Sequence, residues 1–225
     1  MKRLFIVAFL LTSIFLQASC SRGEEDKEIV RNSVIVDDSV LSNISVYELN
    51  DRYSLNCNTD QDTGIITVSG DFDDLIVQSE SDAIFALSTF QSLFHISDLS
   101  YSCRIDITEN DNVVYDMTQM YQNVPVYKYG FKLLTDKSGR LISIKGKYAD
   151  DILCNPNNHI SLREAREAIR KDIIINSYEL IIFRENSRIY APAWYLNVND
   201  GESSGYIILN AVNRMIVEWD YLITN

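Results

Sequence analysis

The chain has 225 residues, of which 46% are hydrophobic and 13 are tyrosines, and its formal net charge is −12. This length allows one or two modest domains with a buried core. The apolar, tyrosine-rich composition favours a folded, β-rich protein over a disordered one. We predict no nucleic-acid partner, because phosphate binding needs a basic surface that displaces counterions. The acidic balance fits a solvated exported protein, or one whose partner has a basic surface.

The first 20 residues have the pattern of an export signal. Two basic residues precede an apolar run over residues 4–16, which is shorter than the ~20 residues of a transmembrane helix and has the flanks of a secretory signal. The end of the run, Ala18-Ser19-Cys20, resembles a bacterial lipobox, although Gln17 stands where Leu is usual. We therefore expect a signal peptide over residues 1–20 with Cys20 as a lipid anchor and no other membrane attachment. Simple cleavage and secretion is the alternative.

The next elements are expected in the following order. Residues 21–30 are charged and lack apolar periodicity, which predicts a tether. Residues 29–49 give a weak pattern that is typical of short strands or extended chain. A hairpin is expected from Tyr53–Asn58 and Ile65–Gly70, because turn residues separate the two runs. Residues Ser79–Phe94 predict a helix, since a capping serine precedes apolar residues at helical spacing.

Three consecutive antiparallel strands are predicted between Val113 and Gly146, after a further strand at Ser100–Thr108. The turns are expected at Asn123–Pro125 and Asp136–Gly139, where Asn and Gly tolerate a left-handed backbone and Pro presets φ. The middle strand alternates strictly, so that its aromatic and apolar side chains share one face. The residues of that face are Tyr127, Tyr129, Phe131 and Leu133.

This segment resembles the fungalysin/thermolysin propeptide (FTP) family. The positions that match its signature are Gln119, Tyr121, Val124-Pro125-Val126, Asp136, Gly139 and Gly146. Two positions depart from it: the family usually has Gly where Asn123 stands and a small residue where Lys128 stands. The resemblance implies a first module over residues 31–149.

The second half begins with a break in the pattern at residues 150–158, which contain Pro and three Asn. Ser161 and Glu164 then form a capping-box pattern that opens a helix running to about Asp172. Pro192 is expected at a sheet edge or a bulge, because it cannot donate to a ladder. The four strands that follow are expected at residues 179–184, 190–198, 206–210 and 215–221.

A helix followed by such strands resembles the PepSY module that follows the FTP module in thermolysin-type precursors. The matching positions are Ala193-Trp194 and Leu209-Asn210-Ala211, with Asn210 in place of the family's usual acid. The resemblance implies a second module over residues 150–225. The expected fold class is α+β, with two small modules that are each an antiparallel β-meander packed on a helix.

Three cysteines remain if Cys20 carries lipid, and an odd number leaves one unpaired in an oxidising compartment. Cys57 and Cys103 both lie in predicted strands of the first module and are the expected disulfide pair. Reduced, buried cysteines are the alternative, because spacing alone does not fix Cα distances. Together with Cys154, these residues show no Cys-x-x-Cys spacing, so no zinc or redox motif is indicated.

Residues for catalysis are missing from the sequence. Thermolysin-type chemistry needs two histidines one helical turn apart with a neighbouring Glu, whereas His95 and His159 are the two histidines of this chain and lie far apart. No nucleophile elbow or phosphate-binding glycine loop is present. We predict that the protein is not an enzyme and uses no metal and no cofactor.

The FTP resemblance implies an extracytoplasmic protein that binds a thermolysin-like metalloprotease and inhibits it or assists its folding. In that family the end of the propeptide leads into the protease, so the C-terminal residues are expected to contact a partner's cleft. These residues are Tyr221, Leu222, Ile223, Thr224 and Asn225. The alternative for this tail is that it completes the last strand. The alternative functions are a cell-envelope scaffold or adaptor, and a relic of a truncated protease gene.

Overall fold

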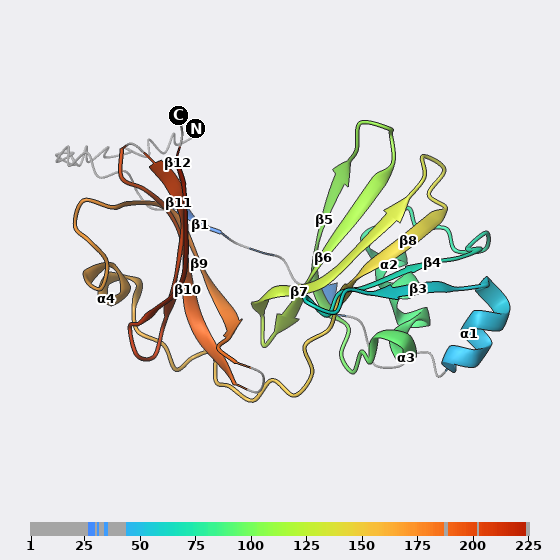
Figure 1. Ribbon diagram of the computed structural model, residues 1–225, viewed down its shortest axis with the longest axis horizontal. Helices are drawn as coiled ribbons and strands as arrows, with labels where there is room; N and C mark the ends of the chain where they lie inside the picture. Colours follow the sequence, from blue (N-terminus) through green and yellow to red (C-terminus); the bar gives the residue numbers. More distant parts are fainter. Residues whose placement is uncertain are drawn as a thin grey trace, which may run out of the picture.

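The computed structural model describes residues 27–29, 31, 34–35, 44–186, 189–201 and 203–223. The fold is mixed α+β, made mostly of strands, and Figure 1 shows it as two lobes. Two short N-terminal strands are β1 (Lys27–Glu28) and β2 (Val34–Ile35). The N-terminal lobe contains α1 (Val46–Tyr53), β3 (Asn56–Thr59), β4 (Ile66–Ser69), α2 (Glu80–Thr89), α3 (Gln91–Phe94), β5 (Ser100–Ile107), β6 (Val113–Tyr121), β7 (Val124–Thr135) and β8 (Leu141–Lys147). The C-terminal lobe contains α4 (Leu162–Glu167), β9 (Ile174–Arg184), β10 (Tyr190–Asn199), β11 (Ser203–Asn210) and β12 (Ile216–Ile223).

All the strands are connected through β7. The main order of the sheet is β12-β11-β10-β9-β7-β6-β5-β2, and β8, β4 and β3 continue it from the other side of β7. The second part of β7, Gly130–Thr135, lies between β6 and β8. Its first part pairs with β6 and joins β9 through one parallel bridge, Val126 to Ile182. The contact between the lobes therefore depends on the first part of β7.

A wide bulge separates the two parts of β7. Residues Val126–Tyr129 lie opposite Gln119 alone, because the ladder passes from the Thr118–Gly130 pair to the Met120–Pro125 pair. Lys128 has a φ of 63° and Gly130 a φ of 141°. Both are conformations that side-chain-bearing residues rarely adopt. A Cβ on Gly130 would lie 2.0 Å from the Met117 carbonyl oxygen, so this position requires glycine.

The bulge divides the aromatic face that the alternation of β7 predicts. Phe131 and Leu133 belong to the core of the N-terminal lobe, which fills the space between the sheet and α2. Tyr129 packs instead with Ile182 and Tyr190 of the C-terminal lobe. Tyr127 packs against a third cluster, formed by Ile181, Ala193 and Ile208. The face predicted as one surface thus serves three cores, because the bulge interrupts the two-residue period.

The predicted helices are present, with changed lengths. The helix expected at Ser79–Phe94 is capped by Ser79 but breaks at Phe90 into α2 and α3. The helix α4 has the predicted capping box and ends at Ala168, several residues before the expected end. Helix α1 replaces the extended chain expected there, so that prediction was wrong. Its signal was a capping box of Ser45 and Glu48, which the weak apolar pattern obscured.

Two local predictions need correction. The turn between β6 and β7 consists of Gln122 and Asn123, both with positive φ (48° and 65°), so Pro125 lies inside β7. Pro192 lies in β10, which β9 and β11 flank on both sides, and not at an edge. It is tolerated because the β10–β11 ladder starts at Ala193, and the Pro192 carbonyl accepts from the Ala211 N–H beyond it.

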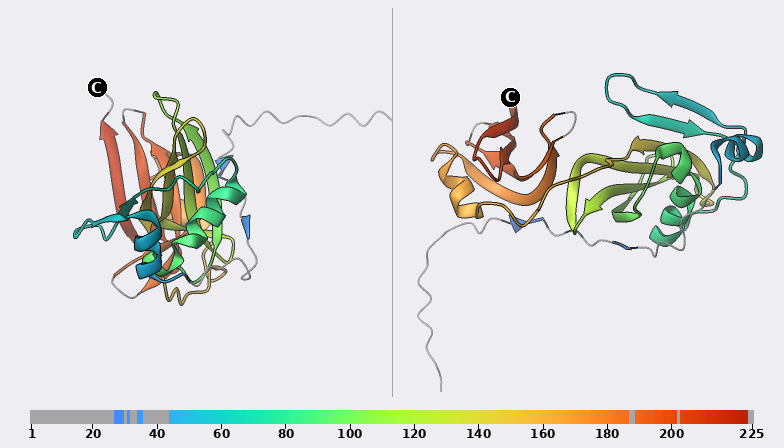
Figure 2. Two further views of the ribbon diagram at one scale, coloured as in Figure 1. Left: turned by 90° about the vertical axis from the view of Figure 1, so that its right-hand side faces the viewer. Right: turned by 90° about the horizontal axis from the view of Figure 1, so that it is seen from below.

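The N-terminal segment joins the C-terminal lobe. Lys27 and Glu28 pair in parallel with Ser177 and Tyr178 of β9, and Figure 2 shows β1 beside that lobe. Residues 27–28 of the expected tether therefore lie in a strand, and residues 21–26 lie outside the described residues. No helix in the described ranges is long and apolar enough to span a membrane.

The two tryptophans offer a matched test of the C-terminal core. Trp194 is buried and donates through Nε1 to the Ile160 carbonyl at 3.0 Å, whereas Trp219 is 69% exposed on the edge strand β12. We expect Trp194→Ala to lower the free energy of unfolding by about 3–5 kcal/mol. Trp219→Ala is expected to change it by less than about 1 kcal/mol. Chemical denaturation measures both, and equal losses would contradict this packing.

Candidate functional site

A cleft of about 730 Å³ lies between the lobes. The cleft-facing sides of β6, β7 and β8 form one wall, and Glu179, Ile181, Tyr195 and Asn197 of β9 and β10 contribute the other. The volume falls within the range of ligand-binding pockets. Because the cleft joins both lobes, its shape depends on the interlobe contacts of β7.

Basic residues outnumber acidic residues in the lining of this cleft. It contains five cationic and two anionic residues, although the chain as a whole has a net charge of −12. The cationic residues are Arg31, Lys128, Lys132, Lys145 and Lys147, and the anionic residues are Asp116 and Glu179. The cleft therefore reverses the charge of the rest of the protein.

The strand registers place two lysines directly opposite each other. Lys132 of β7 faces Lys145 of β8 on one side and Asp116 of β6 on the other. Asp116 is 3.3 Å from the Lys132 Nζ, but it also bonds Arg104 at 3.2 Å. One carboxylate thus serves two cations, and the Lys132–Lys145 pair remains a like-charge cross-strand pair, which is destabilising by itself.

The next pair along the same strands places a lysine opposite a glycine in the lining of the cleft. Lys147 lies opposite Gly130, and Gly130 lies opposite Thr118. Gly130 has no side chain, and its missing Cβ allows the Met117 backbone of β6 to approach closely. The Lys147 Nζ donates to the Thr63 carbonyl at 3.0 Å and lies 4.7 Å from the centroid of the Tyr129 ring. These contacts fix the position of the ammonium group in the lining of the cleft.

The opposite wall is neutralised by a buried ion pair. Glu179 is only 8% exposed at its side chain, and Arg31 binds it with two hydrogen bonds of 2.6 and 3.2 Å. A buried carboxylate needs such a partner. Arg31 also lies 3.4 Å from the Thr118 hydroxyl, so it bridges both walls of the cleft.

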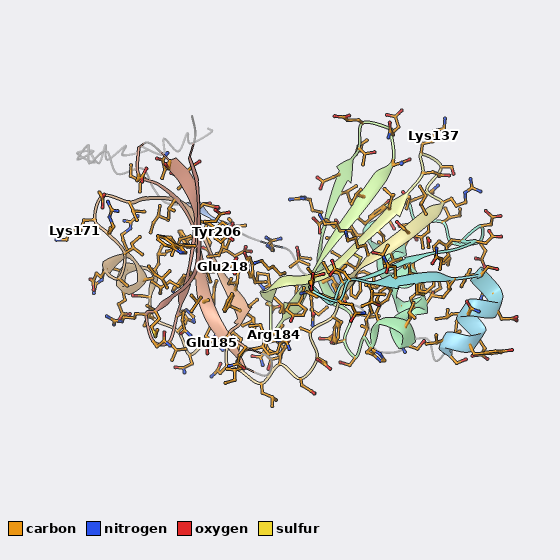
Figure 3. All side chains as sticks on the ribbon, in the orientation of Figure 1. Lys137, Lys171, Arg184, Glu185, Tyr206 and Glu218 are labelled. Atoms are coloured by element: carbon orange, nitrogen blue, oxygen red, sulfur yellow. The ribbon has the colours of Figure 1, made fainter. Side chains whose placement is uncertain are left out.

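A second polar cluster, which we term the Glu218 cluster, joins the lobes. Glu218 of β12 accepts hydrogen bonds from Lys128 Nζ and the Tyr206 hydroxyl, each at 2.7 Å, and from the Tyr127 hydroxyl at 3.3 Å. Figure 3 labels Glu218 and Tyr206 on the side of the C-terminal sheet that faces the N-terminal lobe. Tyr127 packs on Tyr195, which stacks on Tyr206 at 5.3 Å. The bulge of β7 supplies both N-terminal members of the cluster.

The propeptide-like motif residues have structural roles. The Gln119 side chain makes two 2.8 Å hydrogen bonds to the backbone of Ala149, at the exit from β8. Asp136 accepts from Ser138 and Arg140 in the second turn, and the Ser138 bonds, with the others, lower its pKa to about 2. Gly146 lies under Phe131, where a Cβ would approach the ring to 2.5 Å. The motif side chains therefore shape the meander, and the charged residues of the cleft stand at other positions.

The predicted disulfide is not formed. Cys57 on β3 and Cys103 on β5 carry free thiols, as does Cys154. Four strands, β4, β8, β7 and β6, stand between the first two. At about 4.8 Å per strand this exceeds the ~7 Å limit for bridged Cα atoms. Burial, with the charges of Glu80 and Asp116, raises the pKa of Cys103 to about 12, so its thiol stays protonated at neutral pH.

The histidines lie apart. His95 ends α3 in a left-handed conformation, and His159 packs edge-to-face on Trp194. Across the residues that the structure describes, no three His, Cys, Asp or Glu side chains are grouped as metal ligands.

The predicted partner-contact residues are divided by the structure. Tyr221, Leu222 and Ile223 complete β12 and pair with Gly205, Ser204 and Ser203 of β11. Thr224 and Asn225 lie outside the described residues, as does Cys20.

Comparison with known proteins identifies one family motif. Residues 106–148 match the Fungalysin/Thermolysin Propeptide Motif, which confirms that part of the predicted resemblance. The Bacillus megaterium YpeB C-terminal domain is a structural neighbour with 14% sequence identity and a TM-score of 0.40, over 85% of this chain and 99% of that one. No curated protein matches the sequence significantly. The resemblance of the second half to PepSY modules remains a prediction.

The Glu218 cluster predicts a pH-dependent contribution to stability. Burial raises the pKa of Glu218, but the hydrogen bonds and charge of Lys128 and the Tyr206 hydroxyl outweigh it, so the pKa lies below its ordinary 4.5. The stabilisation is thus fully present above pH 4.5 and is lost as the pH falls through the lowered pKa. We expect Glu218→Gln to cost on the order of 1 kcal/mol at pH 7.

The difference between wild type and Glu218→Gln is expected to shrink towards zero below pH 4.5. Denaturant titrations across this range measure it. Asp220→Asn is the control, because Asp220 is an exposed acid on the same strand. A Glu218→Gln effect that is constant down to the acid transition would exclude the assigned charge interaction.

Proposed function

We propose that this protein is an exported, non-catalytic, propeptide-like protein that binds a thermolysin-like metalloprotease and inhibits it or assists its folding. The observation that carries this proposal is the propeptide motif at residues 106–148. The strands of that motif, β6, β7 and β8, form one wall of the interlobe cleft. A propeptide acts through its contact surface, and the cleft supplies a concave surface built on rigid strands.

We further propose that the chain consists of an FTP-like module over residues 31–149 and a PepSY-like module over residues 150–225. Each lobe has an apolar core of its own and a helix packed on strands, which supports this division. Arg31 is an exception at the first boundary, because it binds Glu179 of the second lobe.

An envelope scaffold or adaptor is the second candidate function. It is favoured by the edge strand β12 and the turn before it, where large apolar side chains are exposed. Met215 is 62% exposed and Trp219 is 69% exposed. An exposed apolar edge of this kind is suited to protein contact.

Inhibition of a thermolysin-like protease by the purified full chain tests the leading proposal. We expect inhibition at micromolar protein, because a preorganised surface loses little entropy on binding. Comparing inhibition by the full chain and by a C-terminal truncation distinguishes contact through the tail from contact through the remaining surface. Deleting only Thr224 and Asn225 is the sharper truncation, since deleting Tyr221–Ile223 also removes pairing with β11.

Loss of inhibition in the two-residue truncation would support contact through the C-terminal tail. Equal inhibition by both forms would move the contact to the cleft or the sheet. No inhibition or folding assistance by the full chain would favour the scaffold function.

We also propose that Cys20 carries lipid and anchors the protein outside the cytoplasm. The protein is expected to partition with membranes and Cys20→Ser to release it, because a bacterial lipoprotein carries several acyl chains and one chain binds only marginally. Membrane fractionation and mass spectrometry of the mature N-terminus measure this. An unmodified N-terminus at another residue would exclude the anchor and leave secretion.

A further inference from the structure

We infer that the interlobe cleft binds an extended acidic segment of a partner protein, with carboxylates at alternate positions held by Lys145 and Lys147. Such binding does not require that the partner be a protease. The inference rests on the charge of the cleft, on the spacing of these two lysines and on the space between the lobes.

The first observation is the excess of positive charge. Lys132 and Lys145 face each other across β7 and β8 and share no acid between them. Among the described residues Lys145 makes no ion pair, and its influence on Asp60 is small beside the Thr63 hydrogen bonds that lower the pKa of that acid. Two like charges held together are costly unless an anion joins them. A carboxylate between them converts the repulsion into two attractive contacts.

The second observation is geometric. Lys145 and Lys147 are two residues apart on β8, so their side chains leave the same face of the strand. Their Cα atoms are separated by about 6.6–6.8 Å along an extended chain. An extended peptide has the same spacing between residues i and i+2, so acids at alternate positions match the two lysines. Acids at adjacent positions point to opposite faces and cannot both reach them.

The third observation concerns space and surroundings. The cleft has a volume of about 730 Å³ between the two lobes, which gives an extended segment room beside the lysines. The cleft also contains apolar and aromatic side chains, among them Ile181 and Tyr195. A peptide with apolar residues between its acids uses these walls, whereas an inorganic anion uses only the charges. The chemistry of the cleft therefore favours a peptide.

The experiment compares two capped hexapeptides of identical composition, each with two glutamates among valine and threonine. One peptide has the glutamates at alternate positions, and the other has them adjacent. Binding to the full chain is measured by calorimetry at low and at physiological salt, because exposed charge interactions weaken with ionic strength. We expect the alternate peptide to bind at least about fivefold more tightly than the adjacent one.

Variants of the lysines assign the contact. Lys145→Gln and Lys147→Gln are each expected to weaken the alternate peptide by about fivefold, and the double variant is expected to abolish the preference. Lys137→Gln and Lys171→Gln are matched controls. They remove the same charge far from the cleft, at the tip of the β7–β8 hairpin and in the C-terminal lobe (Figure 3), and are expected to leave binding unchanged.

Thermal unfolding supplies an independent readout. Lys145→Gln removes the repulsion with Lys132, so the variant is expected to be at least as stable as wild type while it loses affinity. Equal binding of both peptides, or of inorganic phosphate as tightly as the alternate peptide, would overturn the proposal and leave a general anion site. An equal loss of affinity in the Lys137→Gln control would overturn the proposal as well. So would the absence of detectable binding to the wild-type chain. A protease is not used, so these outcomes are separate from those of the inhibition assay.

Discussion

The backbone of β7 must pair in two directions, and the bulge at Val126–Tyr129 allows this. Four residues opposite one change the direction of the strand, so that its first part reaches β9 while its second part remains between β6 and β8. Gln119, the single residue opposite the bulge, then binds the backbone of Ala149 where the chain leaves β8. A buried amide with both groups satisfied fixes the start of the connection to the C-terminal lobe. These hydrogen bonds, together with the packing of β7 on β9, help to fix the position of one lobe on the other.

The two sides of the bulge have different chemistry. Tyr127 and Lys128 turn towards Glu218 and add a polar, charge-assisted contact between the lobes. Tyr129 turns to the opposite cluster, where its hydroxyl accepts from Arg184 at 2.6 Å. Apolar packing around Ile182 lies between these contacts. The interlobe junction therefore combines polar and apolar contacts. The stabilisation from its Glu218 contacts is expected to decrease at acid pH.

The side chains that stabilise the meander and the charged side chains that line the cleft belong to different residues. The motif positions make turns, bulge and close strand approach, and their side chains are largely used within the protein. Lys128, Lys132, Lys145 and Lys147 stand at other positions of the same strands and line the cleft. The motif therefore accounts for the shape of the meander, whereas binding depends on the surface residues.

Much of the strand order along the chain followed from local sequence. Turn residues and two-residue alternation identified the strands from β3 to β12, and capping serines identified α2 and α4, because these signals act within a few residues. The resemblance to the FTP family was visible for the same reason, since its motif lies within one continuous segment.

The tertiary structure decided what depends on distant residues. The bulge in β7 was not visible in its alternating sequence, because it depends on pairing with β6 and with the distant strand β9. The pairing of Cys57 with Cys103 failed because four strands separate them, and the sequence contains no measure of that order. The cleft was likewise not predictable from local sequence, because its lining comes from strands of both lobes, including β8 and β9. Local sequence determines backbone conformation, whereas long-range pairing determines which side chains meet.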